Sequence, residues 1–257
     1  MGSTQSSIGR TAMFRLLAAC TLGLAAFAAI PATQAHPGKE WRSSLDDGER
    51  ISTSWSGTAR FDQVTLASKD DVRVTRGDRW RIRASGNPVV LAELRFKVED
   101  GALIIGRRSN RDKIEGSARI EVIAPAVEGV TLAGSGDLSI DTMDTDQVDA
   151  IVAGSGTIEV ARIAARELTA TVAGSGDLRI AGRAGNGRIT IAGSGEIDGQ
   201  RLRLERASVS IAGSGDARFS ADGSVSASIV GSGDAIVSGT TDCTQTRMGS
   251  GRLTCSR

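Results

Sequence analysis

The tripeptide Gly-Ser-Gly recurs seven times in the second half of the chain, which has 257 residues. The copies begin at Gly134, Gly154, Gly174, Gly193, Gly213, Gly231 and Gly249. The intervals between them are 20, 20, 19, 20, 18 and 18 residues. A nearly constant period is the signature of a repeat protein, in which each unit packs mainly against its two neighbours. The repeat therefore limits the possible folds more than any other feature of the sequence.

Each repeat has strand-like segments on both sides of its tripeptide. Residues 130–133 and 137–140 alternate apolar and polar positions around the first copy, and the later copies follow the same pattern. Period-two alternation rich in Val, Ile and Thr is typical of β-strands. The two glycines of each tripeptide let the chain turn sharply between such strands.

A unit of this length cannot bury an apolar face alone, but stacking pairs each strand with the same strand of the next unit, about 4.8 Å away. We therefore expect an all-β fold, a parallel β-helix-like solenoid whose Gly-Ser-Gly turns form one column. A β-propeller or sandwich is the alternative, but a propeller blade needs about 40 residues, twice this period. The inward-pointing residues are expected to include Leu138, Ile158, Leu178, Ile197 and Ile229.

Residues 39–130 lack the tripeptide but contain alternating runs, for example at 61–66, 71–74 and 80–84. A solenoid must cover its terminal strands, because their unpaired backbone groups would template aggregation. We interpret this segment as an irregular N-terminal β portion that caps the stack and is continuous with it.

The first 35 residues have the organisation of a secretory signal peptide, with basic residues before the apolar run 16–30 and Ala35 at the expected cleavage site. A membrane anchor is one alternative, but 15 residues of helix rise only about 22 Å, short of a roughly 30 Å bilayer core. A lipoprotein anchored at Cys20 is another. Cleavage after Ala35 predicts a periplasmic or secreted protein without a transmembrane segment, beginning with an N-terminal extension at 36–58.

Composition argues against a nucleic-acid partner. Removing residues 1–35 changes the formal charge from +1 to −1, because that segment holds two arginines and no acidic residue. A near-neutral chain with interspersed charges has no electrostatic basis for binding nucleic acid. Aromatic residues make up only 3% and tyrosine is absent, so platforms for stacking bases or sugars are scarce.

Two cysteines remain after cleavage, Cys243 and Cys255. In an oxidising compartment such a pair predicts a disulfide, here one that braces a C-terminal end coil at 241–257. Closing so short a loop stabilises the fold by about 3 kcal/mol in the chain-entropy model. Two free buried thiols are the alternative.

Four further segments stand out beside the repeats: 61–64 (Phe-Asp-Gln-Val), 71–74 (Asp-Val-Arg-Val), 101–105 (Gly-Ala-Leu-Ile-Ile) and Pro125. Together with the Ala-Gly-Ser-Gly-Asp units, they resemble the bacterial head GIN domain family over residues 59–240. That family is a domain of unknown function described as auto-transporter adhesins. The resemblance implies a β-solenoid, export through a signal peptide and a location in the cell envelope. It implies no catalytic residues.

The residue after the tripeptide is acidic in five of the seven repeats. If the turns stack, four of these residues form consecutive carboxylates in one column: Asp177, Glu196, Asp216 and Asp234. Such a row could attract a cation, and carboxylate oxygens suit Ca²⁺. The alternative is that each carboxylate accepts hydrogen bonds from turn N–H groups and stays hydrated.

The sequence offers little for catalysis. A nucleophilic serine needs a positioned base, and the single histidine, His36, would be the first residue after cleavage. No other cofactor is indicated. We therefore expect a non-catalytic, exported cell-envelope protein with an adhesin-like binding or scaffold surface.

Two other functions stay open at this point, a glycan-acting β-helix enzyme and a purely structural envelope component. The expected partner is an envelope macromolecule, either protein or glycan. An end-to-end homo-oligomer is also possible, because an exposed end coil could pair two solenoids.

Overall fold

The computed structural model describes residues 45–51, 60–108 and 114–257. They belong to one compact unit, Glu40–Arg257, and are almost entirely β-strand. The expected signal peptide, Cys20 and His36 lie outside the described residues, as does most of the expected extension at 36–58. Among the described residues, no helix is long and apolar enough to cross a membrane.

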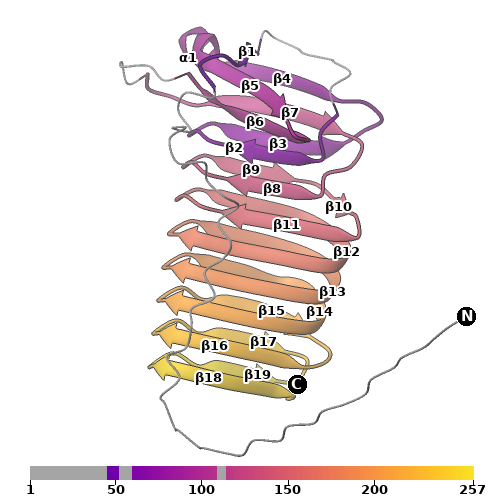
Figure 1. The fold of residues 1–257 in the computed structure, drawn as a ribbon, viewed down its shortest axis with the longest axis vertical. Helices are drawn as coiled ribbons and strands as arrows, with labels where there is room; N and C mark the ends of the chain where they lie inside the picture. The colour runs from indigo at the N-terminus through magenta and orange to yellow at the C-terminus, as the bar shows by residue number, and fades with distance from the viewer. Residues whose placement is uncertain (1–44, 52–59, 109–113) are drawn as a thin grey trace, which may run out of the picture. The chain divides into compact units, whose positions relative to one another are not determined.

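The strands of this unit form coils that stack along one axis (Figure 1), joined in a 19-stranded sheet. We call the strands that lead into a Gly-Ser-Gly tripeptide, with those in register with them, the upstream face. It consists of β6 (Ala102–Arg107), β2 (Gln63–Leu66), β8 (Gly129–Leu132), β11 (Gln147–Val152), the C-terminal parts of β12 (Thr157–Gly174), β13 (Asp177–Gly193) and β14 (Glu196–Gly213), β16 (Val225–Gly231) and β18 (Cys243–Gly249).

The strands that leave a tripeptide, with those in register with them, form the downstream face. It consists of β7 (Ala118–Ala124), β3 (Asp71–Arg76), β9 (Asp137–Ile140), the N-terminal parts of β12, β13 and β14, β15 (Ala217–Ala221), β17 (Ala235–Ser238) and β19 (Leu253–Ser256). The long strands β12, β13 and β14 therefore belong to both faces. Short β10 (Met143–Asp144) pairs in parallel with β12, near the register shift between Val160 and Ile163.

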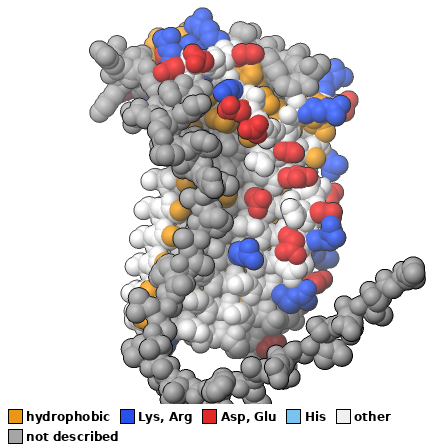
Figure 2. Space-filling model, viewed as in Figure 1, with side chains coloured by type: hydrophobic (Ala, Val, Ile, Leu, Met, Phe, Trp, Pro, Cys, Tyr) orange, Lys and Arg blue, Asp and Glu red, His pale blue; other side chains and the backbone are white. Residues whose placement is uncertain are grey.

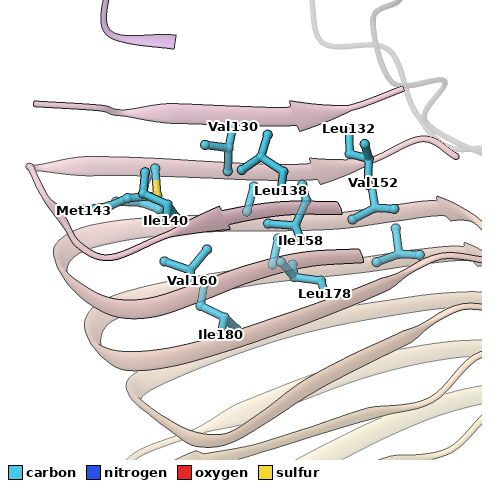
Figure 3. Packing of buried hydrophobic residues seen from close by; sticks show 14 of the residues in the cluster. Val130, Leu132, Leu138, Ile140, Met143, Val152, Ile158, Val160, Leu178 and Ile180 are labelled. Carbon is cyan, nitrogen blue, oxygen red and sulfur yellow. The ribbon is translucent and has the colours of Figure 1, made fainter. Parts of the chain in front are cut away.

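The core lies between the two faces and is built from columns of equivalent residues. Leu138, Ile158, Leu178 and Ile197 are strand partners in consecutive coils, and each is at most 1% exposed. Ile229 of the upstream face is equally buried. Figure 3 shows Leu138, Ile158 and Leu178 pointing into this interior. Burying one such side chain contributes roughly 1.5–3 kcal/mol to the free energy of unfolding. The stacked coils and their buried columns confirm the solenoid predicted from the repeat.

The Gly-Ser-Gly turns lie in one column along the edge of the stack, where the backbones of successive coils approach closely. A Cβ added to Gly193 would fall on the carbonyl oxygen of Gly174 in the preceding coil. Gly193 also has φ +132°, a conformation that L side chains rarely adopt. The second glycine faces the core, because a Cβ on Gly215 would meet Ile191 Cγ2 at 2.6 Å. Both positions therefore require glycine for packing as well as for turning.

The N-terminal coils stack out of sequence order. The coil of β2 and β3 pairs in parallel with β8 and β9 on one side and with the later strands β6 and β7 on the other. Antiparallel strands then cover the outermost coil: β5 (Leu94–Glu99) pairs with β6, β4 (Arg81–Gly86) with β7, and β1 (Glu49–Arg50) with β5. The expected irregular N-terminal β portion is thus one continuous sheet with the repeats.

A short helix, α1 (Pro88–Glu93), connects β4 to β5 at this end of the stack (Figure 1). Pro88 is compatible with its first turn, and the Asn87 side chain accepts a hydrogen bond from the Val89 N–H at 2.9 Å. Val90 is fully buried, so the helix packs onto the core by one side.

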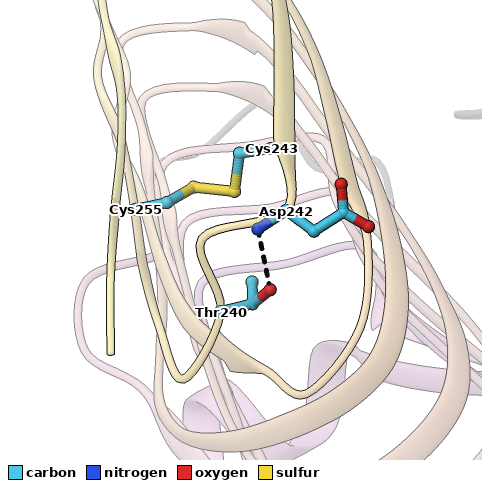
Figure 4. Close-up of a disulfide and its surroundings, with 4 residues drawn as sticks. All are labelled: Thr240, Asp242, Cys243 and Cys255. Carbon is cyan, nitrogen blue, oxygen red and sulfur yellow. Dashed lines mark hydrogen bonds between the residues drawn. A yellow bond between two sulfur atoms is a disulfide. The ribbon is translucent and has the colours of Figure 1, made fainter.

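The last coil differs from the others at its inward positions. Along β18, Gln245 and Arg247 are the strand partners of the buried residues Ala227 and Ile229. The predicted disulfide is present: Cys243 of β18 and Cys255 of β19 join the two faces, with their Cα atoms 6.7 Å apart (Figure 4). Polar side chains and a covalent bridge therefore occupy the place that a further apolar layer would fill.

Candidate binding surface

The four acidic residues predicted as a cation column lie beside one another after the turns. Asp177 and Glu196 are strand partners, and Asp216 and Asp234 follow in the next two coils. Arg218 forms an ion pair with Glu196, and its Nη2 lies 3.7 Å from Asp216 Oδ2. Arg179 Nη2 lies 3.6 Å from Asp177 Oδ2. Three of the four carboxylates of the column, those of Asp177, Glu196 and Asp216, therefore have a guanidinium neighbour.

Two acids of this column, and Asp137 after the first tripeptide, also bind the backbone of the following coil. Asp216 Oδ1 accepts a hydrogen bond from the Asp234 N–H at 2.8 Å, and Asp234 Oδ1 accepts one from the Arg252 N–H at 2.9 Å. Asp137 Oδ1 accepts the same kind of bond from Thr157, at 3.2 Å. Such bonds satisfy amides at the turn and join one coil to the next, which was the alternative role considered for these residues.

Calcium binding by the column stays a prediction. Within residues 45–51, 60–108 and 114–257, no group of three or more His, Cys, Asp or Glu side chains is arranged to hold a metal ion. The serines of the tripeptides are turn residues, and Ser250 Oγ donates to Ser232 Oγ at 3.2 Å.

The downstream face carries a row of alternating charge. Its outward side chains in successive strands are Arg83, Glu121, Arg73, Ser139, Glu159, Arg179, Asp198 and Arg218. Several of these also pair with neighbours outside the row, as Arg73 does with Asp141 at 3.0 Å. Like charges directly opposite each other would destabilise paired strands, so the alternation suits the stack. The charges of this face are largely balanced by one another.

Shallow grooves lie between coils at the corner opposite the tripeptides. One is lined by Glu159, Arg179, Asp198, Gln200 and Arg201, and another by Asp146, Arg166, Asn186 and Arg206. In the second groove two of the charges are paired, since Arg166 Nη2 lies 2.6 Å from Asp146 Oδ2.

The upstream face presents hydroxyl groups in register. Its central row runs through eight strands, and every member is a strand partner of the next: Thr65, Thr131, Ile151, Thr171, Thr190, Ser210, Ser228 and Thr246. A second row lies two residues earlier in each strand: Asp149, Thr169, Arg188, Ser208, Ser226 and Thr244.

An apolar row lies on the other side of the central row, next to the turns: Ala173, Ala192, Ala212, Val230 and Met248. In the view of Figure 2, uncharged surface dominates the lower coils, hydrophobic side chains follow the edge of the turns, and charged side chains gather toward the opposite edge.

These hydroxyl rows were not predicted from the sequence. Their signal is the pattern of two hydroxyl residues separated by one apolar residue ahead of the tripeptide, as at 169–171, 208–210 and 226–228. The pattern identifies the strand, but its meaning as a surface depends on register across coils. A buried ion pair of Asp70 and Arg107 was not predicted either; their Oδ1 and Nη2 atoms are 2.5 Å apart.

Comparison with known proteins identifies similar folds. The family model described as "Putative auto-transporter adhesin, head GIN domain" matches residues 60–241. A crystal structure of a putative adhesin from Bacteroides fragilis is 21% identical, with TM-score 0.71, covering 82% of this chain and all of that one. A putative lipid binding protein from Parabacteroides distasonis is 22% identical, with TM-score 0.60, covering 82% of this chain and 98% of that one. No curated protein matches significantly.

Proposed function

Because the chain belongs to the head GIN domain family of putative auto-transporter adhesins, we propose that it is an exported, non-catalytic, adhesin-like protein of the cell envelope. The observation that carries this proposal is the register of exposed side chains over successive coils on both faces. A row of equivalent groups repeated along a rigid stack presents one chemical pattern many times, as the extended binding surfaces of other solenoids do.

Two features support export. Residues 1–35 have the pattern of a signal peptide, and the Cys243–Cys255 disulfide suits an oxidising compartment. We propose the periplasm or the cell surface as the location, with His36 as the first residue of the mature protein.

Non-catalytic binding is supported by the chemistry of the exposed groups. On the downstream face and in the grooves, arginines and acids alternate along the stack, and several arginines, including Arg73, Arg166 and Arg218, are ion-paired with a neighbouring carboxylate. A catalytic acid or base needs an environment that changes its pKa, and such environments are clefts more often than exposed, hydrated rows.

Localisation and binding test the proposal together. Cell fractionation followed by N-terminal sequencing should place the protein outside the cytoplasm, with a mature chain that starts at His36. The purified protein should then sediment with envelope fragments of the producing bacterium in a saturable manner. A cytoplasmic, full-length product that does not bind these fragments would refute the proposal.

A further inference from the structure

The hydroxyl groups in the central and second rows of the upstream face have no hydrogen-bond partners among the described residues. None of the Ser and Thr side chains in its central and second rows makes a hydrogen bond with another side chain or with backbone in the part of the chain that the structure describes. Some hydroxyl groups elsewhere on the solenoid are paired, as Ser220 Oγ and Ser238 Oγ are at 2.8 Å. The face therefore holds donors and acceptors that only solvent or a ligand can satisfy.

These hydroxyls repeat at regular distances. Partners in adjacent strands lie about 4.8 Å apart along the stack, and residues two apart in one strand lie about 6.7 Å apart across it. In the three C-terminal coils both rows consist entirely of hydroxyl residues: Ser208 and Ser210, Ser226 and Ser228, Thr244 and Thr246. A ligand that uses more than one of these pairs must be extended and must itself repeat hydrogen-bonding groups.

The face lacks what a protein or an anionic partner would use. The central row contains no charged residue, and Asp149 and Arg188 in the second row are two coils apart and opposite in sign. The exposed large hydrophobic residues of the described chain are Val89, Val230, Ile236 and Met248, and the described phenylalanines are buried. Protein interfaces are usually anchored by aromatic residues and arginine, and the three rows of this face hold no aromatic residue and a single arginine, Arg188.

We propose that the upstream face binds an extended, neutral polysaccharide that lies along the solenoid axis. This inference rests on the proposed adhesin-like function and names the class of its partner. Sugar hydroxyls donate and accept hydrogen bonds, as the Ser and Thr hydroxyls do, and need no charge on the protein. The apolar row from Ala173 to Met248 offers a contact for the C–H groups of sugar rings.

Affinity would come from repetition. One neutral hydrogen bond exchanged with water contributes little, about 0.5–1.5 kcal/mol, but a polymer held by one coil meets the next coil at a high effective concentration. The surface should therefore bind long chains well and short oligosaccharides weakly.

The experiment uses envelope fragments of the producing bacterium as the probe, left untreated, oxidised with periodate to cleave vicinal diols of sugars, or digested with proteinase K. We expect periodate to abolish sedimentation of the purified protein and proteinase K to leave it unchanged. Raising NaCl from about 0.05 M to about 0.5 M should have little effect, because contacts with a neutral ligand are not screened by salt.

Surface variants locate the site. The triple variant S208A/S210A/S228A should bind at least about tenfold more weakly, since each lost hydrogen bond contributes a factor of roughly two to ten. The matched control S139A/S220A/S238A changes three serines in strands β9, β15 and β17 of the downstream face. It should bind like the wild type. A second variant, T190K/S210K, places two long charged side chains in the central row and should not bind. Circular dichroism and thermal melting establish that each variant is folded.

The outcomes separate the two proposals. Binding that proteinase K abolishes and periodate spares would overturn the polysaccharide inference and leave the adhesin-like function standing. Equal loss in the triple variant and its control would overturn the assignment to the upstream face. Failure of the wild type to bind untreated fragments would count against the proposed function itself, and the inference would fall with it.

Discussion

The two ends of the solenoid are closed by different means. At the N-terminal end, antiparallel strands β4 and β5 and helix α1 cover the outermost coil, and a buried ion pair ties the coils together. At the C-terminal end none of the strands in residues 45–51, 60–108 and 114–257 covers β18 and β19, and the last coil carries a disulfide and polar inward residues instead. A stack of identical units can thus end either by added structure or by a change of residues within the last unit.

The acid of the N-terminal ion pair lies in a turn that differs in sequence from the Gly-Ser-Gly turns. Ser68-Lys69-Asp70 occupies the place of a tripeptide, since a Cβ on Gly134 or Gly136 would collide with the backbone of Ser68 or Asp70. The Asp70 side chain is fully buried and accepts hydrogen bonds from Arg107 Nε at 2.8 Å and from the Ala118 N–H at 2.7 Å. Arg107 Nη2 also donates to the Gly116 carbonyl at 2.7 Å. One carboxylate therefore links three separate segments of the chain.

The largest expected effect concerns this ion pair. Replacing Asp70 with alanine leaves the Arg107 guanidinium without its carboxylate in a largely buried site, and should lower the free energy of unfolding by about 3–5 kcal/mol. Urea denaturation followed by circular dichroism measures the change.

The matched control is Asp146→Ala, which removes a carboxylate that is 72% exposed in its ion pair with Arg166. This change should cost at most about 1 kcal/mol. Equal losses in the two variants would show that the buried pair is not what holds the N-terminal end together.

The disulfide gives the next largest effect. Replacing Cys243 and Cys255 with serine opens a short loop and should lower the free energy of unfolding by about 3 kcal/mol. Because each coil contacts only its neighbours, amide hydrogen exchange should increase in β18 and β19 and stay unchanged in β2 and β3. Faster exchange at the N-terminal end would contradict independent closure of the two ends.

A change in the inward residues should alter assembly more than stability. The double variant R247I/Q245A continues the apolar column of Ile191, Ile211 and Ile229 into the last coil. An exposed apolar edge favours pairing with another chain, so this variant should form end-to-end dimers in multi-angle light scattering. The control R247E keeps a charge at the inward position and should match the wild type. If the wild type and R247E both form dimers, end-to-end association does not depend on the residue at position 247.

The smallest expected effect concerns the acidic column between the two ends. Arg218 contacts Glu196 and Asp216, so millimolar Ca²⁺ should raise the Tm of the wild type little. Arg218→Ala removes this guanidinium, and Ca²⁺ should then raise the Tm by a few degrees, since a ligand that binds only the folded state stabilises it. The same substitution at Arg166 is the control. No rise in Arg218→Ala would refute cation binding by the column.

The repeats and the ends differ in how much the sequence reveals. The period of Gly-Ser-Gly predicts the solenoid, because one repeated pattern can satisfy neighbouring coils in only a few ways. The Cys243–Cys255 disulfide was also predicted, from composition and compartment. The position of β6 and β7 outside β2 and β3 was not, because residues 39–130 contain no repeat to show which strands are neighbours. Asp70 and Arg107 are 37 residues apart, and neither stands out in a local pattern.

The out-of-order stacking of the first coils has a consequence for how the chain folds. Each repeat after β9 can add to a coil that has already been made, so this part can grow one unit at a time. The coil of β2 and β3 gains its neighbours β6, β7, β8 and β9 only after the chain has been made to Ile140. We expect the N-terminal coils to fold as one cooperative unit that nucleates the rest. Removing whole coils from the C-terminus should therefore leave the remaining coils folded, with an apolar edge exposed at the new end, whereas removing coils from the N-terminus should prevent folding.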